Sequence, residues 1–379
     1  MDFSLSKQEQ LFLQMIREFA EKEVKPLAAE VDESERFPME TVQKMAKLGI
    51  MGIPFPVEYG GAGGNNILYT MAVEELSRVC ATTGVIVSAH TSLCCAPIME
   101  HGTPEQKAKY LPKLTSGEWI GAFGLTEPNA GTDASAQQTF AVKEGDHYVL
   151  NGSKIFITNA GYAHVYIIMA MTDKSKGTKG ISAFIVEKDF PGFSIGKKEK
   201  KMGIRGSSTC ELIMENCIVP AENLLGQEGK GFGIAMKTLD GGRIGIASQA
   251  LGITQGAMDE TVKYVKERKQ FGKAIGQFQN TQFQLADLQT KVEAARLLVR
   301  QAAYKKDLKV PYSADAAMAK LFAAETAMEV TTKAVQFHGG YGYTREYPVE
   351  RMMRDAKITE IYEGTSEVQR MVIAANLLK

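Results

Sequence analysis

The chain has 379 residues, with 44 basic and 44 acidic side chains and a formal net charge of zero. This length predicts two or three domains around a large buried core. The balanced charge gives no reason to expect a nucleic-acid or membrane-surface partner. The start of the chain has no signal-peptide or transit pattern, and no uninterrupted apolar run approaches the ~18 residues of a membrane span, so we expect a cytoplasmic protein.

Cysteine and histidine usage gives no sign of a metal site or of a disulfide framework. The five cysteines include no paired CxxC spacing, and the five histidines never fall at metal-ligand spacing. Cys94 and Cys95 are adjacent in an apolar context, which is more typical of inert core residues than of a redox pair. We therefore expect no metal and no disulfide, as in a reducing compartment.

The first third of the chain predicts helices. Residues 6–9 and 103–106 have the form of capping boxes, and Pro104 occupies the first helical position of the second one. Apolar residues then recur at helical spacing, with further helices expected over about 38–48 and 66–79. The sequence therefore predicts an N-terminal helical domain over residues 1–119.

From about Trp119 the pattern changes to short runs of β-branched and aromatic residues bounded by Gly, Asn and Asp. This pattern is typical of an antiparallel sheet. The dipeptide Asn151-Gly152 favours a type I′ hairpin turn, because both residue types accept the positive φ that this turn requires. We therefore predict a middle antiparallel β-sheet domain over 120–225. Its clearest strands are 147–150, 154–158, 165–169, 181–186 and 210–214.

After Gly226 the periodicity is helical again. A helix is expected from Ser313 to Gln336, ended by the glycines after His338. The sequence predicts a C-terminal four-helix bundle over 226–379 and an α+β fold overall. No βαβ alternation and no GxGxxG opening a helix occur, so a nicotinamide-binding Rossmann domain is disfavoured. The predicted seam of the bundle is Leu285, Leu288, Val292, Ala295, Val299 and Ala302.

The stretch 361–367 contains the acid with the most suggestive surroundings. Glu363 lies between an apolar-aromatic pair and a Gly-Thr-Ser turn. Such a turn can place a carboxylate in an apolar cavity, where burial disfavours the charged form and moves the pKa toward that of a general base. An acid on a surface turn is the alternative interpretation of these residues.

Four other segments combine accessible main chain with polar or aromatic side chains. Residues 123–133 can offer N–H groups and Thr hydroxyls to a heteroaromatic ring edge or an anion, and residues 156–160 can wall a flat cofactor. Residues 239–243 begin a helix with Asp one turn before Arg, which a structural ion pair would also explain. Residues 268–272 join Arg, Phe and Gly in a combination suited to a pyrophosphate. Each segment alone is also compatible with an ordinary loop, strand or helix end.

Taken together, these segments resemble the flavin-dependent acyl-CoA dehydrogenases in order and spacing over essentially the whole chain. The resemblance is carried by Thr-Glu-Pro-Asn-Ala-Gly-Thr-Asp at 126–133, Arg-Lys-Gln-Phe-Gly at 268–272, Phe-His-Gly-Gly-Tyr-Gly at 337–342 and Ile-Tyr-Glu-Gly-Thr at 361–365. Each motif is moderately specific, and in this order they are highly specific. The resemblance is closest to the bacterial short-chain (butyryl-CoA) branch.

The resemblance implies a catalytic base, and Glu363 matches it. In some members the base lies directly before the arginine matched by Arg243, but that position is Gly242 here and has no side chain to abstract a proton. Phe156 stands where many members have Trp, and Ala160 where Gly is usual, which leaves the packing of the flavin wall open.

The resemblance also implies the binding residues, with the pyrophosphate and adenine ends of the cofactor held from a neighbouring subunit. The residues expected to bind FAD are Phe123, Leu125, Thr126, Thr132, Phe156, Ile157, Thr158, Arg268, Phe271, Gln279, Gln336, Phe337, Gly339, Gly340, Thr365, Ser366 and Glu367. Those expected to bind acyl-CoA are Thr132, Asp240, Gly241, Gly242, Arg243, Tyr362 and Gly364.

The implied function is the α,β-dehydrogenation of short-chain acyl-CoA, from butyryl-CoA to crotonyl-CoA or the reverse. Glu363 would take the α-proton and flavin N5 the β-hydride. Electron-transferring flavoprotein is the expected partner, in a stable or a transient complex, and a homotetramer built as a dimer of dimers is the expected assembly. Both the range of acyl chain lengths and the direction of the reaction are left open.

Three other functions compete with this one. An acyl-CoA oxidase would pass the electrons to oxygen, but it usually has a longer chain with an added helical region. A non-catalytic family member could act as an assembly or binding protein, although Glu363 and the flavin loops are retained here. An esterase using His338 is disfavoured, because the sequence has no Gly-x-Ser-x-Gly nucleophile turn.

Overall fold

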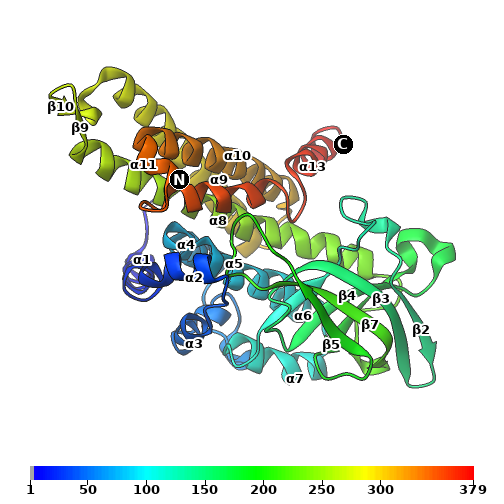
Figure 1. Cartoon of the computed structure of the whole chain (residues 1–379). Coiled ribbons are helices and arrows are strands. Elements are labelled where there is room, and N and C mark those ends of the chain that lie inside the picture. The colour runs from blue at the N-terminus through cyan, green and yellow to red at the C-terminus, as the bar shows by residue number, and fades with distance from the viewer. Residues whose placement is uncertain (1–3) are drawn as a thin grey trace.

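Three groups of elements follow one another along the chain (Figure 1). The computed structural model describes residues 4–379, so residues 1–3, where the predicted first domain begins, lie outside the described part. The helices of the first group lie beside the sheet of the second, and the long helices of the third run across them. The predicted α+β order of helices, sheet and helices is confirmed.

The N-terminal helices begin at the predicted caps. The Glu9 N–H donates to Ser6 Oγ at 3.3 Å and the Ser6 N–H donates to Glu9 Oε2 at 2.7 Å, which completes the capping box of α1. Thr103 and Gln106 form the same motif before α7. The α-helices are α1 Lys7–Phe19, α2 Ala28–Ser34, α3 Met39–Lys47, α4 Asn66–Val79, α5 Ala81–Ala89, α6 Ala96–His101 and α7 Pro104–Thr115.

The second group is a sheet of strand order β6-β7-β3-β2-β4-β5-β8, with β1 also paired to β4. Most neighbouring strands are antiparallel, as predicted, but β1 runs parallel to β4, so the sheet is mixed. The intervening β2 and β3 provide the long crossover that a parallel pair requires. The strands are β1 Gly121–Gly124, β2 Phe140–Glu144, β3 His147–Thr158, β4 Val165–Met171, β5 Ile181–Glu187, β6 Phe193–Lys198, β7 Thr209–Pro220 and β8 Leu224–Leu225.

The predicted hairpin turn at Asn151-Gly152 is wrong. Both residues lie within β3, so the chain forms no turn here. The register against β7 shifts at this point, because β7 has two residues and β3 only one between the pairs Leu150–Cys217 and Gly152–Met214, which places the bulge on β7. A Cβ on Gly152 would lie 2.6 Å from Thr139 Oγ1, and this close approach requires glycine. The two-residue hairpin turn joins β2 to β3 instead, at Gly145 and Asp146.

The third group contains three long helices. Helix α8 (Gly231–Glu267) has 37 residues and spans about 55 Å at a rise of 1.5 Å per residue. The segment 240–243 therefore does not begin a helix, as the sequence suggested, but lies about a quarter of the way along α8. The other elements are the short strands β9 Lys269–Gln270 and β10 Lys273–Ala274 and the helices α9 Gln279–Asp307, α10 Ser313–His338, α11 Gly340–Tyr343, α12 Val349–Lys357 and α13 Ser366–Leu377.

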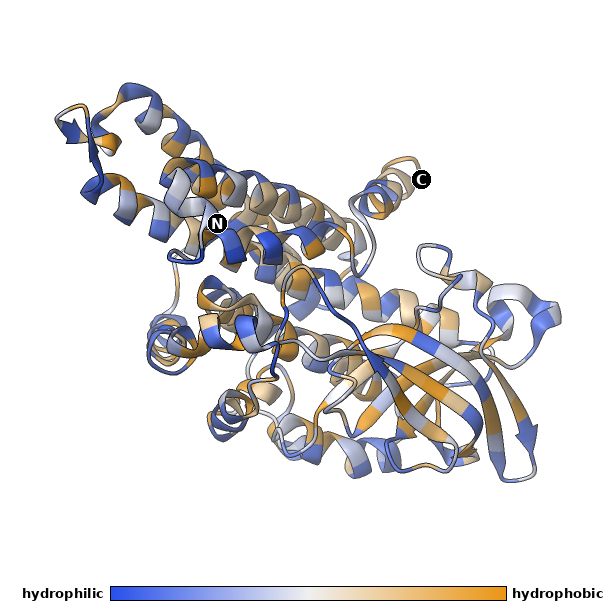
Figure 2. Ribbon diagram, in the orientation of Figure 1, coloured by the Kyte–Doolittle hydropathy of each residue, from blue (hydrophilic) through white to orange (hydrophobic). Residues whose placement is uncertain are grey.

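The apolar seam predicted on α9 is confirmed for all positions except Leu285, which is only partly buried and packs against the same core. This core joins the helices α8, α9, α10 and α12. A second hydrophobic cluster links the sheet to the long helices, and it includes β4, β5 and the first turns of α8. Figure 2 shows hydrophobic residues concentrated along the strands, with hydrophilic residues along the outer faces of the helices.

The run Ala81–His101 is apolar and long enough to span a membrane, but 89% of its most apolar window is buried inside the protein. This burial is typical of a core helix.

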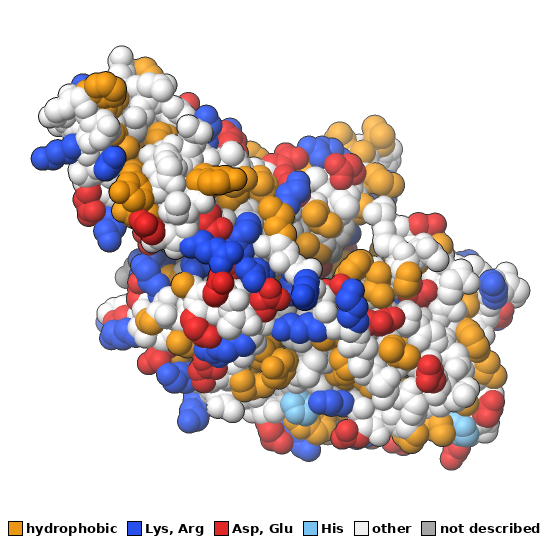
Figure 3. All heavy atoms as spheres, in the orientation of Figure 1, with side chains coloured by type: hydrophobic (Ala, Val, Ile, Leu, Met, Phe, Trp, Pro, Cys, Tyr) orange, Lys and Arg blue, Asp and Glu red, His pale blue; other side chains and the backbone are white. Residues whose placement is uncertain are grey.

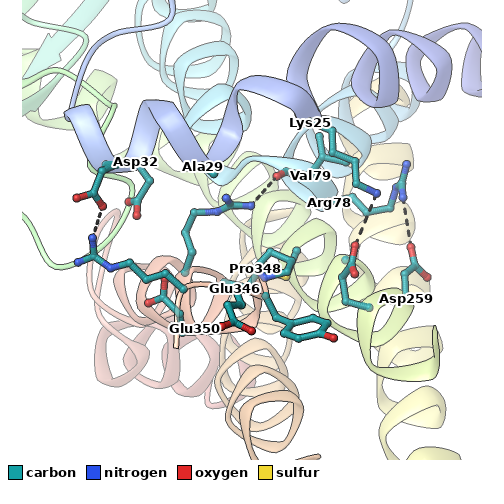
Figure 4. A pocket seen from close by; sticks show the side chains of 16 residues that line it. Lys25, Ala29, Asp32, Arg78, Val79, Asp259, Glu346, Pro348 and Glu350 are labelled. Atoms are coloured by element: carbon teal, nitrogen blue, oxygen red, sulfur yellow. Dashed lines mark hydrogen bonds and ion pairs between the residues drawn. The ribbon is translucent and has the colours of Figure 1, made fainter. Parts of the chain in front are cut away.

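A charged cavity of about 410 Å³ marks the junction of the first and third groups (Figure 4). Arg78 of α4 pairs with Asp259 of α8 at 3.3 Å, and Lys25 pairs with Glu260 at 3.6 Å. Among residues 4–379, none of those expected to bind FAD or acyl-CoA lines this cavity. Its ion pairs hold the N-terminal helices against α8 and α12.

Candidate active site

Glu363 lies on a strained turn between α12 and α13. The φ angle is 53° at Glu363 and 93° at Gly364, so two consecutive residues depart from the usual negative range. A residue with a Cβ rarely adopts this conformation and has to be held in it by its surroundings. Lys320 Nζ and Gln369 Nε2 both donate to Gly364 O, at 2.7 and 2.8 Å. Thr365 then caps α13, its hydroxyl accepting a backbone N–H of the first turn at 3.3 Å.

Glu363 is half-buried, and one of its two carboxyl oxygens is enclosed by protein. Its Oε2 is shielded from solvent and has no hydrogen-bond partner in the described part of the chain. Burial disfavours the charged form and raises the pKa of Glu363 to about 7, although the charges of Lys320 and Arg243 act in the opposite direction. A carboxyl group with this pKa can accept a proton near neutral pH. These surroundings differ from those of an acid on an open surface turn, which is the alternative interpretation.

Gly242 of α8 faces the Glu363 carboxylate. A Cβ built on Gly242 would overlap Glu363 Oε2 and would lie 2.8 Å from Leu93 Cδ2. A larger residue at position 242 therefore cannot coexist with Glu363 in this conformation. Positions 242 and 363, the two at which the sequence resemblance allows a base, therefore project into one volume, and the Glu363 carboxylate fills that volume here.

Arg243 carries a charge next to this volume. Its Nη1 donates to Asp240 Oδ1 at 2.5 Å, and Ser313 Oγ donates to the same oxygen at 2.9 Å. The ion pair that the sequence suggested is therefore present. Arg243 Nε is buried without a partner among the described residues, so it remains able to donate to a ligand. The neighbouring Tyr362 hydroxyl donates to Gln249 Oε1 of α8.

The segments expected to wall the flavin lie together at one end of the sheet. Phe123 and Leu125 belong to the cluster that also contains the first turns of α8. The Ile155 N–H donates to Thr126 O at 2.9 Å, which ties this loop to the strand that carries Phe156. Phe156 has a φ of 61° and is 61% exposed, so it stands clear of the sheet. The same segments contain the buried Ile157, the half-buried Thr158 and the exposed Thr132.

Lys154 supports this loop from within the protein. Its buried Nζ contacts Glu127 Oε1 at 2.7 Å, Leu125 O at 3.2 Å and Gln137 Oε1 at 3.2 Å. Glu127 also accepts two backbone N–H groups, at 2.5 and 3.0 Å. Burial lowers the pKa of Lys154 to about 8, against the opposing charge of Glu127. The pair fixes the main chain on both sides of Thr126.

A second group of expected cofactor residues surrounds a cavity at the far end of α8. The cavity has a volume of about 500 Å³ and is lined by Arg268, Phe337, Gly339 and Gly340, among others. The Arg268 guanidinium lies 5.7 Å from the centre of the Tyr341 ring. A positively charged group, an aromatic ring and accessible main chain suit the pyrophosphate and adenine parts of a dinucleotide.

This second group is remote from Glu363. Arg268 follows Arg243 by 25 residues, which corresponds to about 37 Å along α8. Phe271 is 93% exposed in the strand pair beyond α8, Gln279 opens α9 and Gln336 lies in the last turn of α10. One chain therefore does not bring the two groups of expected cofactor residues together.

Unsatisfied atoms at both parts fit a flavin dinucleotide. Ser366 Oγ and Gln369 Oε1 near Glu363, and His338 Nε2 at the remote cavity, are buried without partners within residues 4–379. Buried polar atoms are normally hydrogen-bonded, so unpaired ones point to an additional partner. A Cβ on Gly339 or Gly340 would meet no atom within 4 Å, so the main chain there is open to a ligand. The adjacent Glu367 is exposed in the first turn of α13.

Three residues that hold the main chain of the site were not predicted from the sequence: Lys320, Gln369 and Lys154. A signal for Lys320 was present. Lys320 shares a face of α10 with Ala316 and Ala323, at spacings of four and three residues, and both alanines are buried. A lysine on such a seam is expected to be buried, and a buried lysine needs a polar partner.

Three family models match the chain in order. They describe the N-terminal domain of acyl-CoA dehydrogenase over residues 6–118, the middle domain over 122–217 and the C-terminal domain over 229–378. The chain is 67% identical over 379 residues to the short-chain specific acyl-CoA dehydrogenase of Clostridium acetobutylicum, with 100% of both chains covered. It is 53% identical to the acryloyl-CoA reductase (NADH) of Anaerotignum propionicum, covering 100% of this chain and 96% of the relative.

Solved structures give the same result. The butyryl-CoA dehydrogenase of Megasphaera elsdenii matches with a TM-score of 0.98 and 55% identity over 100% of both chains. A chain in the structure that describes the electron-transferring flavoprotein of Acidaminococcus fermentans and flavin-based electron bifurcation matches with a TM-score of 0.99 and 58% identity, again over 100% of both chains. The chain therefore belongs to the acyl-CoA dehydrogenase family of FAD-dependent oxidoreductases.

Proposed function

We propose that this protein interconverts butyryl-CoA and crotonyl-CoA, with Glu363 as the base that abstracts the α-proton. The observation that carries the proposal is the Glu363 carboxyl group, whose Oε2 is shielded from solvent without a partner among the described residues and whose pKa is raised by burial to about 7. The α-proton of a thioester is only weakly acidic, so its removal needs a desolvated base held in contact with the substrate.

The residues around Glu363 have distinct proposed roles. Oε2 accepts the α-proton, and the Glu363 N–H donates to the thioester oxygen, where negative charge develops in the transition state. Arg243, through its unpartnered Nε, and Tyr362 orient the acyl-CoA beside α8. Thr132, Asp240, Gly241, Gly242 and Gly364 complete the proposed substrate site. When bound, the flavin supplies the acceptor for the β-hydride.

The proposed FAD site is divided between two subunits. The flavin ring is assigned to the 123–132 loop and the 156–158 end of β3, and the 365–367 turn contacts the same molecule. The remote cavity around Arg268 belongs to the FAD of the neighbouring subunit, because the ~37 Å separation along α8 prevents one chain from completing the site.

We propose a homotetramer, assembled as a dimer of dimers, that brings these halves together. Exposed apolar side chains support contacts between subunits. Met371, Leu377 and Leu378 on α13 are 66%, 81% and 83% exposed. Figure 3 shows hydrophobic side chains both on this helix and at the end of the long helices that carries β9. The proposed limits of the three domains within each subunit remain 1–119, 120–225 and 226–379.

The relatives support both the substrate class and the partner. Two of them are described as acting on short-chain acyl-CoA or butyryl-CoA, and one matching structure describes an electron-transferring flavoprotein. We therefore propose short straight-chain thioesters as substrates and electron exchange with electron-transferring flavoprotein in the cytoplasm. The relative described as an acryloyl-CoA reductase supports testing the reductive direction as well.

Anaerobic titration of the FAD-loaded protein with saturated acyl-CoAs of graded chain length tests this function. We expect butyryl-CoA to bleach the visible absorbance of the flavin most efficiently. Glu363→Gln should retain FAD and bind butyryl-CoA without bleaching. Near-normal reduction of that variant would exclude Glu363 as the base.

The electron acceptor is tested by reoxidising the reduced protein. Fast reoxidation by electron-transferring flavoprotein and slow reoxidation by air are expected. Rapid formation of peroxide under air would instead identify an oxidase. A purified protein that cannot take up FAD would point to the non-catalytic alternative.

A further inference from the structure

We propose that Lys320 is a positioning residue for this reaction: it clamps the Glu363–Gly364 turn and supplies the positive charge that keeps the Glu363 carboxylate ionised in a dry site. The proposal rests on the function assigned to Glu363. Lys320 lies on α10 and is fully buried, and its Nζ donates to Gly364 O at 2.7 Å.

The contact determines the shape of the catalytic turn. Glu363 and Gly364 both have positive φ, which Glu363 adopts only under constraint from its surroundings. Two donors converge on the carbonyl of Gly364, one from α10 through Lys320 and one from α13 through Gln369. The turn that aims the carboxyl group is therefore tied to two helices, and Lys320 provides the tie to the core of the bundle.

A lysine at this position is not explained by packing. The same face of α10 carries the buried alanines Ala316, Ala319, Ala323 and Ala327. An ammonium group in such surroundings is unfavourable unless it is paired. Within the described chain, the one hydrogen bond of Lys320 Nζ is to Gly364 O. A neutral side chain of similar length would fill the space without this cost, so the charge itself has a role.

Charged and titratable groups face Glu363 from each of the packed helices. The two positive charges are Lys320, on α10, and Arg243, on α8. Two tyrosines also lie nearby: Tyr69 of α4, and Tyr362, which precedes Glu363 in the chain. Burial raises the pKa of both tyrosines, so both are neutral near pH 7. Arg243 is already paired with Asp240 at 2.5 Å. Lys320 forms no ion pair among the described residues. The carboxylates of Glu363, Glu360 and Glu367 favour its charged form, and Glu363 has the largest effect of the three.

The positive charge of Lys320 matters before the proton is transferred, when Glu363 has to be ionised. A base that abstracts a proton has to be ionised when the substrate binds, and burial of Glu363 opposes ionisation. A neighbouring ammonium favours the carboxylate and increases the fraction of protein that is ready to react near pH 7. Burial lowers the pKa of Lys320 to about 8, and the charge of Glu363 is the largest opposing effect, so each group favours the charged form of the other.

Lys320→Met and Lys320→Gln separate the charge from the hydrogen bond. Glutamine keeps a donor for Gly364 O without the charge, and methionine removes both. Lys291→Met is the matched control, because Lys291 is an exposed lysine of α9 that pairs with Glu329 at 2.6 Å. FAD content and thermal unfolding confirm that each variant is folded, and Lys320→Arg tests whether a charged donor restores the wild-type behaviour.

Two measurements follow the ionisation of Glu363. The first is the pH dependence of kcat/KM for flavin reduction by butyryl-CoA, whose acid limb reports the free enzyme. The second is infrared difference titration of the FAD-loaded protein without substrate, with Glu363→Gln identifying the carboxyl band. In both Lys320→Met and Lys320→Gln we expect the midpoint to rise by about one pH unit or more, as loss of a neighbouring opposite charge predicts.

The two variants should differ at high pH. Lys320→Gln should approach the wild-type rate once Glu363 is ionised, whereas Lys320→Met should stay below it because the turn is no longer held. Midpoints equal to that of the wild type in both variants would overturn the proposal. A wild-type protein that butyryl-CoA fails to reduce would instead refute the proposed function, and the infrared titration would still decide the role of Lys320.

Discussion

Replacing Glu363 with glutamine removes the proposed base together with a charge that burial disfavours. The variant should therefore lose activity and gain stability. Burial raises the pKa of Glu363 from 4.5 to about 7 in the folded protein. At 1.36 kcal/mol per pH unit, this difference corresponds to roughly 3 kcal/mol against the ionised form. Between these two pH values the folded chain binds more protons than the unfolded chain, so stability is lost as pH rises. The cost is absent below about pH 4.5 and complete above about pH 7.

Glu363→Gln should therefore be more stable than the wild type at pH 8, by up to roughly 3 kcal/mol, and nearly equal to it at pH 4. Denaturant unfolding of the FAD-free protein at both pH values measures this difference. The rate of flavin reduction by butyryl-CoA should fall by about 10²- to 10⁴-fold, the usual contribution of a general base. Stopped-flow absorbance under anaerobic conditions measures that rate.

The two readouts refute different parts of the reasoning. A stability difference that does not depend on pH would show that the Glu363 carboxyl group titrates like an exposed one. A variant that is reduced at nearly the wild-type rate would show that another group takes the proton. A stable, FAD-loaded and inactive variant is the outcome that the geometry predicts.

Two further substitutions test the rest of the site, and a third tests a buried acid outside it. Gly242→Ala places a Cβ in the volume of the Glu363 carboxylate, the proposed base, so we expect flavin reduction to fall at least tenfold while FAD content is preserved, and a fully active variant would contradict the overlap. Lys154→Met leaves the Glu127 carboxylate buried without its cation; breaking a buried pair costs about 3 to 5 kcal/mol, so denaturant unfolding should show a loss of this order together with weaker FAD retention. Outside the site, Asp355 of α12 is buried and accepts the Ile204 N–H at 2.5 Å. Burial raises the pKa of Asp355 to about 6, so its contribution to stability declines between about pH 4 and 6. Asp355→Asn should flatten the pH dependence of the unfolding midpoint in that window, and an unchanged profile would contradict this assignment.

The helices were predictable because their signals are local. The capping boxes at Ser6 and Thr103 lie within four residues of the helices that they begin, and the seam of α9 follows a single period. The error at Gly152 has the opposite cause. The dipeptide Asn-Gly accepts a hairpin turn, but contact with Thr139 and pairing with β7 decide the conformation there, and both involve residues distant in sequence.

The site was only partly predictable for a related reason. The segment around Glu363 could be recognised, because its glycine and hydroxyl residues form a compact motif. The contributions of Lys320 and Lys154 come from other elements, whose approach depends on how α10 and β3 pack. Most lysines lie at the surface, so composition alone gives no reason to assign these two to the interior.

The shared volume of Gly242 and Glu363 also restricts how such a protein can change during evolution. An acid cannot be added at position 242 while Glu363 remains in place, because the two side chains would occupy the same space. Loss of Glu363 first leaves the chain without a base. If Glu363 is the base, as proposed, transfer of the base from this turn to α8 has no active single-substitution intermediate, so a lineage that holds its base at one position is expected to keep it there unless both positions change together.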